Sequence, residues 1–277
     1  MLNPIPSLGT YNGGKSGDGV YQTIINHIPP IGEKLIIGCL GHCGILRNIK
    51  PAKENYGFDV DPAVILKWIG LDLPYNYIID QCDILKWIKE NPYFFSPGDF
   101  LYLDPPYLFD TRKGGNKPLY KFEWNREQHI TMLKLVTELR CNIAISCYDN
   151  PLYQKHLKGW NKITFVAQTR RGPATETLYF NYPFPTQLHD YSYIGKDYRE
   201  RENISKKIKR HVSKLQALPV LERNAIIHAL NDQVSELPVR TRKVCGNPDC
   251  GKIFNPNTAR AVYCSDRCRV ASHRKQR

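Results

Sequence analysis

The sequence predicts an α/β fold built on a doubly wound, Rossmann-like sheet. Over the first 190 residues, short apolar runs typical of buried strands alternate with segments of helical periodicity. Several of these runs end in glycine or in acidic residues, as strands do where an open α/β sheet meets its ligand-binding loops. With 42% hydrophobic and 23% charged residues, the composition is that of a folded globular protein. Alternation of this kind favours a sheet covered by helices on both faces.

Each element of this fold can be assigned to a stretch of the chain. Strands are expected at 35–40, 56–61, 99–104 and 142–147. Helices are expected between them, at 62–68, 83–89 and 125–140. The last helix should bury one apolar face, which consists of Ile130, Leu133, Val136, Thr137 and Leu139. Two further segments, 163–166 and 177–182, should close the sheet as an antiparallel hairpin.

The alternation of strands and helices ends at the prolines at 183 and 185. Residues 197–217 predict a basic amphipathic helix, and a second helix is expected from Val220 to Val234. The apolar stripe of the first helix consists of Ile204, Ile208, Val212 and Leu215. The last segment, 243–277, is rich in Cys and Arg. We therefore expect three parts: a catalytic domain (1–190), a basic helical segment (191–238) and a small metal-binding module (239–277).

Charge is concentrated at the carboxyl-terminal end of the chain. The net charge is +13, of which residues 191–277 carry +11 and residues 1–190 carry +2. A near-neutral body with a basic tail favours a catalytic core joined to a polyanion-binding module, although a solvated basic tail would look the same. The apolar stretch Leu35–Leu46 is too short to span a bilayer, and no secretory leader is recognised. Nine Cys, an odd number, favour reduced thiols and a cytoplasmic protein without a membrane partner.

The segment Asp104-Pro105-Pro106-Tyr107 follows an apolar strand and carries unusual chemistry. Its prolines remove two backbone donors, stiffen the loop and leave carbonyl oxygens free to accept. The carboxylate of Asp104 also accepts, and Tyr107 offers a flat ring for stacking. Two acceptors would hold the protons of an exocyclic amine and draw its lone pair out of conjugation, so the amine could attack an electrophile. The alternative is a rigid strand-to-loop turn, which the two prolines alone would favour.

With this motif, the chain resembles the S-adenosylmethionine-dependent amino-group methyltransferases. Within them it is most similar to the DNA adenine-N6 methyltransferase family typified by the Dam enzymes. The resemblance covers about residues 8–183, and five segments match in the family's order: Tyr11–Lys15, Phe58–Asp61, Asp104–Tyr107, Ile145–Asp149 and Thr175–Tyr182. It implies a Rossmann-like methyltransferase sheet, S-adenosylmethionine as cofactor, and Asp104, Pro105, Pro106 and Tyr107 as the catalytic residues.

The resemblance also implies which residues bind the cofactor: Tyr11, Lys15, Gly41, Asp59, Asp83 and Asp104. Lys15 should lie near the methionine carboxylate, and Tyr11 should pack close to the cofactor. Asp59 should accept the ribose hydroxyls, and Asp83 should lie near the adenine. Both acids have an alternative role as helix N-caps, a role that fits Asp61 better than Asp59.

The glycine loop, residues 38–44, departs from the family pattern. Gly41 stands where a glycine is expected, but Cys43 occupies the second glycine position and Gly44 is displaced by one. The acid that usually precedes the loop is absent. We expect Cys39 and Cys43 to be buried thiols rather than ligands of a metal ion.

The family's target-recognition insertion is missing, because Asp83 and Asp104 lie only 21 positions apart. Recognition must therefore be done elsewhere. The candidates are the carboxyl-terminal module and the loop Phe109–Phe122, whose basic residues are Arg112, Lys113, Lys117 and Lys121.

Four cysteines near the end of the chain predict a zinc site. They form two pairs, Cys245 with Cys250 and Cys264 with Cys268, separated by 13 residues. Two such pairs give a closed tetrahedral thiolate site without an open catalytic position. The pattern resembles a treble-clef finger, in which the second pair begins a helix, here 265–274. A pair of disulfides is the alternative, which the expected reducing compartment disfavours.

Together these features predict an enzyme that methylates the N6 amine of an adenine flipped out of double-stranded DNA, with a structural zinc. Such an enzyme would belong to a prokaryotic cell or its virus, in a restriction-modification or phage setting. The alternatives are an RNA base-amine methyltransferase and a DNA-binding protein whose methyltransferase fold is inactive.

Overall fold

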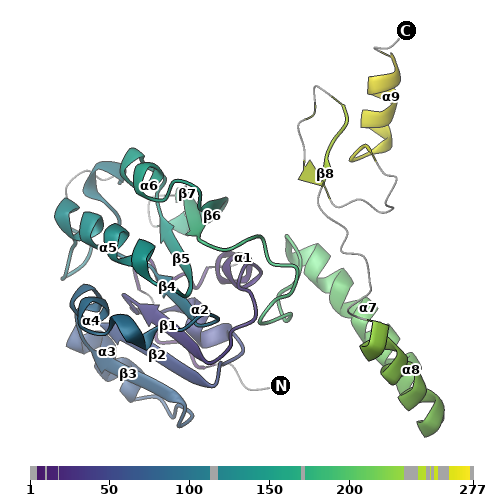
Figure 1. The fold of residues 1–277 in the computed structure, drawn as a ribbon, viewed down its shortest axis with the longest axis horizontal. Coiled ribbons are helices and arrows are strands. Elements are labelled where there is room, and N and C mark those ends of the chain that lie inside the picture. The colour runs from purple at the N-terminus through teal and green to yellow at the C-terminus, as the bar shows by residue number, and fades with distance from the viewer. Residues whose placement is uncertain are drawn as a thin grey trace. The chain divides into compact units, whose positions relative to one another are not determined.

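The computed structural model describes residues 5–9, 11–17, 19–112, 118–169, 172–233, 243–247, 250, 253–254 and 262–274 (Figure 1). The chain divides into two compact units, 1–207 and 208–277. Among the residues described, no helix is long and apolar enough to cross a membrane.

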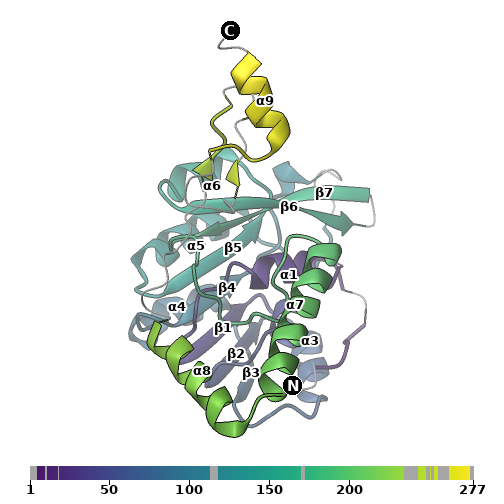
Figure 2. The same ribbon diagram turned by 90° about the vertical axis from the view of Figure 1, so that its right-hand side faces the viewer.

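The first unit is built on a seven-stranded sheet with the order β3-β2-β1-β4-β5-β7-β6. Strands β1 to β5 pair in parallel, whereas β7 is antiparallel to both β5 and β6. Figure 2 shows the long β6–β7 pair at one edge of the sheet and β3 at the other. The strands are β1 (Lys34–Gly38), β2 (Glu54–Asp59), β3 (Tyr77–Gln81), β4 (Phe100–Leu103), β5 (Asn142–Cys147), β6 (Asn161–Thr169) and β7 (Gly172–Phe180).

Helices cover both faces of this sheet, so the predicted doubly wound α/β class is confirmed. One core holds residues of α1 (Val20–Ile25), α2 (Gly44–Asn48) and α3 (Pro62–Ile69). The opposite core holds residues of α4 (Ile84–Glu90), α5 (Arg126–Glu138) and α6 (Pro151–His156). Strand β4 shows how one strand serves both cores, because Phe100 and Tyr102 enter the first and Leu101 and Leu103 the second.

The predicted elements differ from the observed ones in definable ways. The expected strand 142–147 coincides with β5, and the predicted closing hairpin is β6–β7. The face predicted for the helix at 125–140 is partly wrong: His129, Met132, Leu133 and Val136 are buried, whereas Thr137 is exposed. In the first unit, the elements without a predicted counterpart are β3, α1, α2, α6 and the short 3-10 helices at Pro92–Phe94 and Phe109–Thr111.

The chain continues to contact the first unit beyond residue 190. Asp190 is buried and accepts a hydrogen bond from the backbone N–H of Lys50 at 2.8 Å. Tyr193 packs edge-on against Tyr21 of α1, with ring centroids 5.2 Å apart. The first compact unit runs up to residue 207.

The remaining elements begin with two helices, α7 (Tyr198–Gln216) and α8 (Val220–Gln233). The residues of α7 that the structure describes are not buried, and Ile208 and Val212 of its apolar stripe are 51% and 44% exposed. A two-stranded sheet, β8 (Lys243–Val244) with β9 (Ile253–Phe254), and the helix α9 (Asp266–Arg274) complete the second unit. The end expected for the second helix, Val234, lies outside the described residues.

Asn181 should contribute to stability where β7 ends. Its side chain accepts from the N–H of Ile143 at 2.8 Å and donates to the carbonyl of Cys141 at 2.9 Å. Asn181→Ala removes both bonds and should lower the free energy of unfolding by about 1–2 kcal/mol. Urea denaturation measures this, with Asn203→Ala on the exposed surface of α7 as control. Equal midpoints for the two variants would contradict the assignment.

Candidate active site

A cavity of about 410 Å³ lies where strands β1 to β4 end at their carboxyl edge. Open α/β sheets bind ligands at this edge, and the volume lies within the range of small-molecule sites. All the residues predicted to bind a cofactor line the cavity except Lys15: these are Tyr11, Gly41, Asp59, Asp83 and Asp104. Segments far apart in the sequence thus meet in one place.

The glycine loop forms one wall of this cavity through close contacts. Gly41 has a positive φ of 46°, and a Cβ atom there would lie 2.6 Å from the ring of Tyr11. The Gly41 carbonyl accepts from the indole of Trp68 at 2.7 Å, and its N–H donates to Asp59 at 2.8 Å. Only glycine combines this conformation with this approach. The loop is therefore held between the first segment of the chain and the ends of β2 and α3.

The displaced glycine at 44 has a structural reason. Its N–H donates to the carbonyl of Gly14 at 2.7 Å, and a Cβ atom there would lie 2.7 Å from the carbonyl oxygen of Lys15. Cys43 is buried, and its sulfur accepts from the N–H of Leu46 at the start of α2. Burial raises the pKa of this thiol to about 11. Gly44 thus lies where the amino-terminal segment, at Gly14 and Lys15, crosses the glycine loop.

The acids at the strand ends combine two roles. Asp59 is 8% exposed and accepts from the N–H groups of Gly41 and Asp61. Burial raises its pKa above the usual value. Its remaining lone pairs can still accept from a ligand in the cavity. Asp61 caps α3, as expected, and Asp83 both caps α4 and lines the cavity.

A group of four buried or half-buried side chains lies at the end of β4, and we call it the charge cluster: Lys15, Asp104, Tyr107 and Glu176. The Lys15 ammonium lies 2.8 and 2.7 Å from the two carboxylate oxygens of Asp104 and 3.4 Å from Glu176. The Tyr107 hydroxyl donates to Glu176 at 2.8 Å. Burial raises the pKa of Asp104 to about 6, with Lys15 opposing the rise and Glu176 adding to it.

Lys15 thus binds groups of the chain itself. Its ammonium also lies 3.2 Å from the carbonyl of Gly13, and its side chain is 2% exposed. Although burial opposes the charge, Asp104 and Glu176 raise its pKa above the usual value. The expected contact of Lys15 with a methionine carboxylate stays a prediction, because in this structure both acids of the charge cluster hold the ammonium.

The loop that follows Tyr107 is folded back onto the motif by an ion pair. Arg112 donates through Nε to the carbonyl of Tyr107 at 2.7 Å and through both terminal nitrogens to Glu123, at 2.8 and 2.6 Å. Glu123 also accepts from the N–H groups of Leu119 and Tyr120. Arg112, expected as a recognition residue, therefore contacts the backbone of the Asp104–Tyr107 motif. The expected recognition residues Lys113 and Lys117 lie outside the described residues.

Sequence reasoning assigned no role to several residues of this site. Glu176 and Tyr148 each lay in a segment that matches the family, but neither was given a role. The ring of Tyr148 meets Tyr107 edge-on, with the ring centroids 4.6 Å apart. His129 is fully buried beside Trp124 and Tyr153, and burial lowers its pKa to about 4, so the imidazole is neutral. In the sequence, the only indication was a histidine in the helix that follows the Asp104–Tyr107 motif along the chain.

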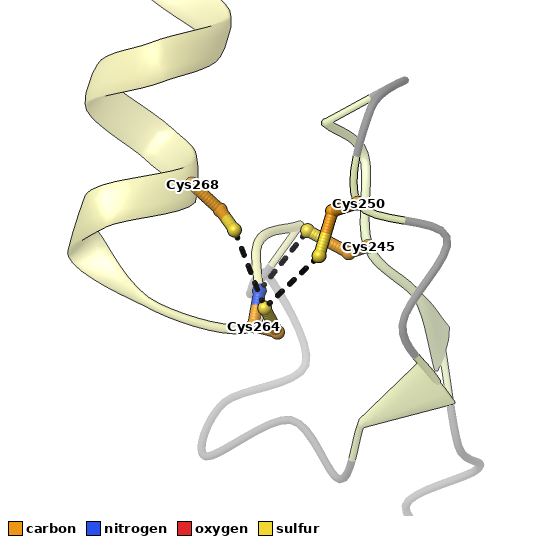
Figure 3. Close-up of side chains that lie close together, drawn as sticks. All are labelled: Cys245, Cys250, Cys264 and Cys268. Atoms are coloured by element: carbon orange, nitrogen blue, oxygen red, sulfur yellow. Dashed lines mark hydrogen bonds between the residues drawn. The ribbon is translucent and has the colours of Figure 1, made fainter.

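The four carboxyl-terminal cysteines are brought together, as predicted. Their sulfur atoms all lie within 4.8 Å of one another, and Figure 3 shows them pointing toward a common centre. The separations Cys250–Cys264 and Cys264–Cys268 are 3.7 and 3.5 Å. A tetrahedral zinc ion with sulfur ligands at about 2.3 Å requires sulfur–sulfur separations of about 3.8 Å. The donor set therefore fits a structural zinc ion.

Comparisons with known proteins give structural similarity at low identity. No protein-family model matches the chain, and no curated protein matches it significantly. A precorrin 8W decarboxylase from Methanobacterium thermoautotrophicum is 14% identical over 65% of this chain and 94% of its own, with a TM-score of 0.38. A SAM-dependent methyltransferase from Agrobacterium tumefaciens is 14% identical over 58% of each chain, less than two thirds of its length, with a TM-score of 0.37. An rRNA methylase from Streptococcus thermophilus is 12% identical over 58% of this chain and 93% of its own, with a TM-score of 0.36. The functional argument therefore rests on the site.

Loss of the Asp59 carboxylate should weaken cofactor binding. Asp59→Ala removes a charged acceptor from the cavity wall and both of its bonds to the loop backbone. A charged hydrogen bond contributes about 1.5–3 kcal/mol, so the affinity for S-adenosylmethionine should fall about 10- to 100-fold. Calorimetric titration measures the affinity, with Asp72→Ala at an exposed acid as control. Unchanged affinity in Asp59→Ala would remove Asp59 from the binding site.

The cysteine cluster should hold one zinc ion per chain. Four thiolates close the coordination shell, so this ion would support folding of the module and leave no position for a reacting water. Metal analysis of freshly purified protein should find zinc in the wild type and in Cys82→Ser, and far less in Cys264→Ser. Zinc-free wild-type protein would refute the site.

Proposed function

We propose that this protein transfers a methyl group from S-adenosylmethionine to the exocyclic N6 amine of adenine in DNA. One observation carries the proposal: Asp104 and Pro106 of the Asp104–Tyr107 motif line the same cavity as Tyr11, Gly41, Asp59 and Asp83, the residues expected to bind the cofactor. The motif expected to hold an amine is thus in contact with the pocket expected to hold the cofactor, which supports the proposal.

The residues of the cavity suit the cofactor. Asp59 has lone pairs free for ribose hydroxyls, and Asp83 stands at the end of β3, where the adenine is expected. Tyr11 packs over Gly41 and supplies an aromatic wall. When bound, S-adenosylmethionine supplies a methyl group on a positively charged sulfur, which makes that methyl electrophilic.

The chain's own residues would prepare the amine. Asp104 and the carbonyl oxygen of Pro105 accept the two amine protons, which directs the nitrogen lone pair out of the ring's conjugation. The nitrogen–methyl bond would form as the sulfur–methyl bond breaks, which would leave S-adenosylhomocysteine, and one amine proton would pass to solvent. Tyr107 would stack on the base. Catalysis would rest on positioning and electrostatics, without a covalent enzyme intermediate.

DNA as the substrate is supported by the order of the five matching segments and by the charge of the chain. The net charge of +11 over residues 191–277 is suited to phosphate contacts. Helix α7 alone carries Arg199, Arg201, Lys206, Lys207, Lys209, Arg210 and Lys214. The target adenine would have to leave the duplex to reach Tyr107, because the amine is otherwise paired within the stack.

Asp104→Ala should abolish methyl transfer while sparing most of the DNA affinity. In this proposal the carboxylate accepts from the amine, besides pairing with Lys15, and loss of one group that stabilises developing charge costs about 10²- to 10³-fold in rate. The effect is measured as transfer of labelled methyl groups to duplex DNA or to RNA, with reactions that lack the protein as blanks. Asp110→Ala, at an exposed carboxylate of the same loop, serves as control.

The outcomes of this assay separate the candidate functions. Methyl transfer to duplex DNA that disappears in Asp104→Ala supports the proposal. Transfer to RNA alone would make the protein an RNA base-amine methyltransferase. Transfer to neither, with DNA binding intact, would make it a DNA-binding protein with an inactive methyltransferase fold.

A further inference from the structure

We propose that Glu176 is a positioning residue for methyl transfer, which fixes the base-stacking ring of Tyr107 and shares Lys15 with Asp104. Glu176 would thereby hold the two parts of the substrate site, the aromatic surface and the amine acceptor, in one unit. This inference rests on the proposed function and deepens it, because it assigns a role to a residue outside the catalytic motif.

The topology of the sheet brings Glu176 to the site. Strand β7 runs antiparallel to β5, so its early residues lie at the edge where the parallel strands end. Thr177 pairs with Cys147, the last residue of β5. Glu176 is therefore placed at the carboxyl edge of the sheet, near the end of β4, although it lies about 70 positions after Asp104 in the sequence.

Burial makes the contacts of Glu176 significant. Its side chain is only 7% exposed, and a buried carboxylate is costly unless it is paired and hydrogen-bonded. Its partners are the Lys15 ammonium at 3.4 Å and the Tyr107 hydroxyl at 2.8 Å. Lys15 in turn contacts both oxygens of Asp104. A single lysine thus serves two carboxylates that arise from different strands.

These contacts hold Tyr107 both at its hydroxyl and at its backbone. Its hydroxyl is bound by Glu176, and its backbone carbonyl accepts from Arg112 at 2.7 Å. The ring of Tyr148 packs against it at an interplanar angle of 65°. Stacking with a flat base depends on the orientation of the ring plane, so an anchored hydroxyl bears directly on base binding.

The charge of Glu176 also acts on Asp104. Asp104 can accept the amine protons only when it is ionised, so activity should fall as the pH drops through its pKa of about 6. Like charge from Glu176 contributes to that raised value. Removal of the charge should therefore lower the pKa of Asp104 and move the acid limb of the rate profile to lower pH.

Titration of the other groups around Asp104 would not produce a fall in rate near pH 6. Besides Lys15, Glu176 and Tyr107, thiols and phenols from the neighbouring elements face it: Cys39 and Cys43 after β1, Tyr102 on β4, Tyr120 before α5, Cys147 on β5 and Tyr153 on α6. Burial raises the pKa of each of these groups. They stay neutral near pH 6, whereas Lys15 stays charged.

Two variants of the full-length protein separate the two effects of Glu176. Glu176→Gln keeps an oxygen that can accept from Tyr107 but removes the charge. It should lower kcat and move the acid limb of kcat down by about one pH unit. Tyr107→Phe keeps all the charges and removes only the anchored hydroxyl. It should raise the KM for duplex DNA without moving the limb to lower pH.

The readout is methyl transfer to duplex DNA between pH 5 and 9, with Glu127→Gln at an exposed position of α5 as control. An acid limb unchanged in Glu176→Gln, together with wild-type kinetics in Tyr107→Phe, would overturn the inference while the proposed function stands. If Glu176→Gln does not fold, Tyr107→Phe decides alone, and wild-type KM then overturns the positioning role. A wild type that transfers no methyl group to DNA would overturn the proposed function and this inference with it.

Discussion

The buried ammonium of Lys15, between Asp104 and Glu176, is the contact on which the arrangement of the site depends. Removing one partner of a buried ion pair costs about 3–5 kcal/mol, whereas a surface pair contributes about 0–1 kcal/mol. The amino-terminal segment, the end of β4 and the start of β7 are therefore held together by charge. Because Lys15 has a positive φ of 53°, its backbone adopts a conformation that few non-glycine residues take, and the ion pairs stabilise that conformation.

This constraint explains why the neighbouring loops are built as they are. Holding Lys15 at Asp104 requires its backbone to cross the glycine loop, and Gly44 permits that crossing at a carbonyl contact that no side chain would allow. The same crossing places Tyr11 over Gly41, where it forms a cavity wall. On the other side, the Arg112–Glu123 ion pair fixes the backbone just after the motif. The cavity and the Asp104–Tyr107 motif are thus parts of one packed structure.

Much of the fold followed from local pattern, because strands such as 142–147 are continuous apolar runs and α3 begins with an Asp-Pro signal. β3 was missed because it is an edge strand whose residues are half or fully exposed, so no apolar run marks it. The cavity-lining acids were predictable from their positions at strand ends. The role of Glu176 was not, since it depends on an antiparallel pairing that brings together residues far apart in the sequence. The displacement of the glycine to position 44 could not be explained from sequence either, because it depends on the contact with the Lys15 backbone.

The central claim is that this site methylates adenine in DNA. The most direct measurement is sequencing of modified bases in DNA from cells that express the wild-type protein, compared with cells that express an inactive motif variant. The account predicts N6-methyladenine within a defined sequence context in the first DNA and not in the second. DNA with the same modified bases in both, although the wild type is folded and binds S-adenosylmethionine, would contradict it.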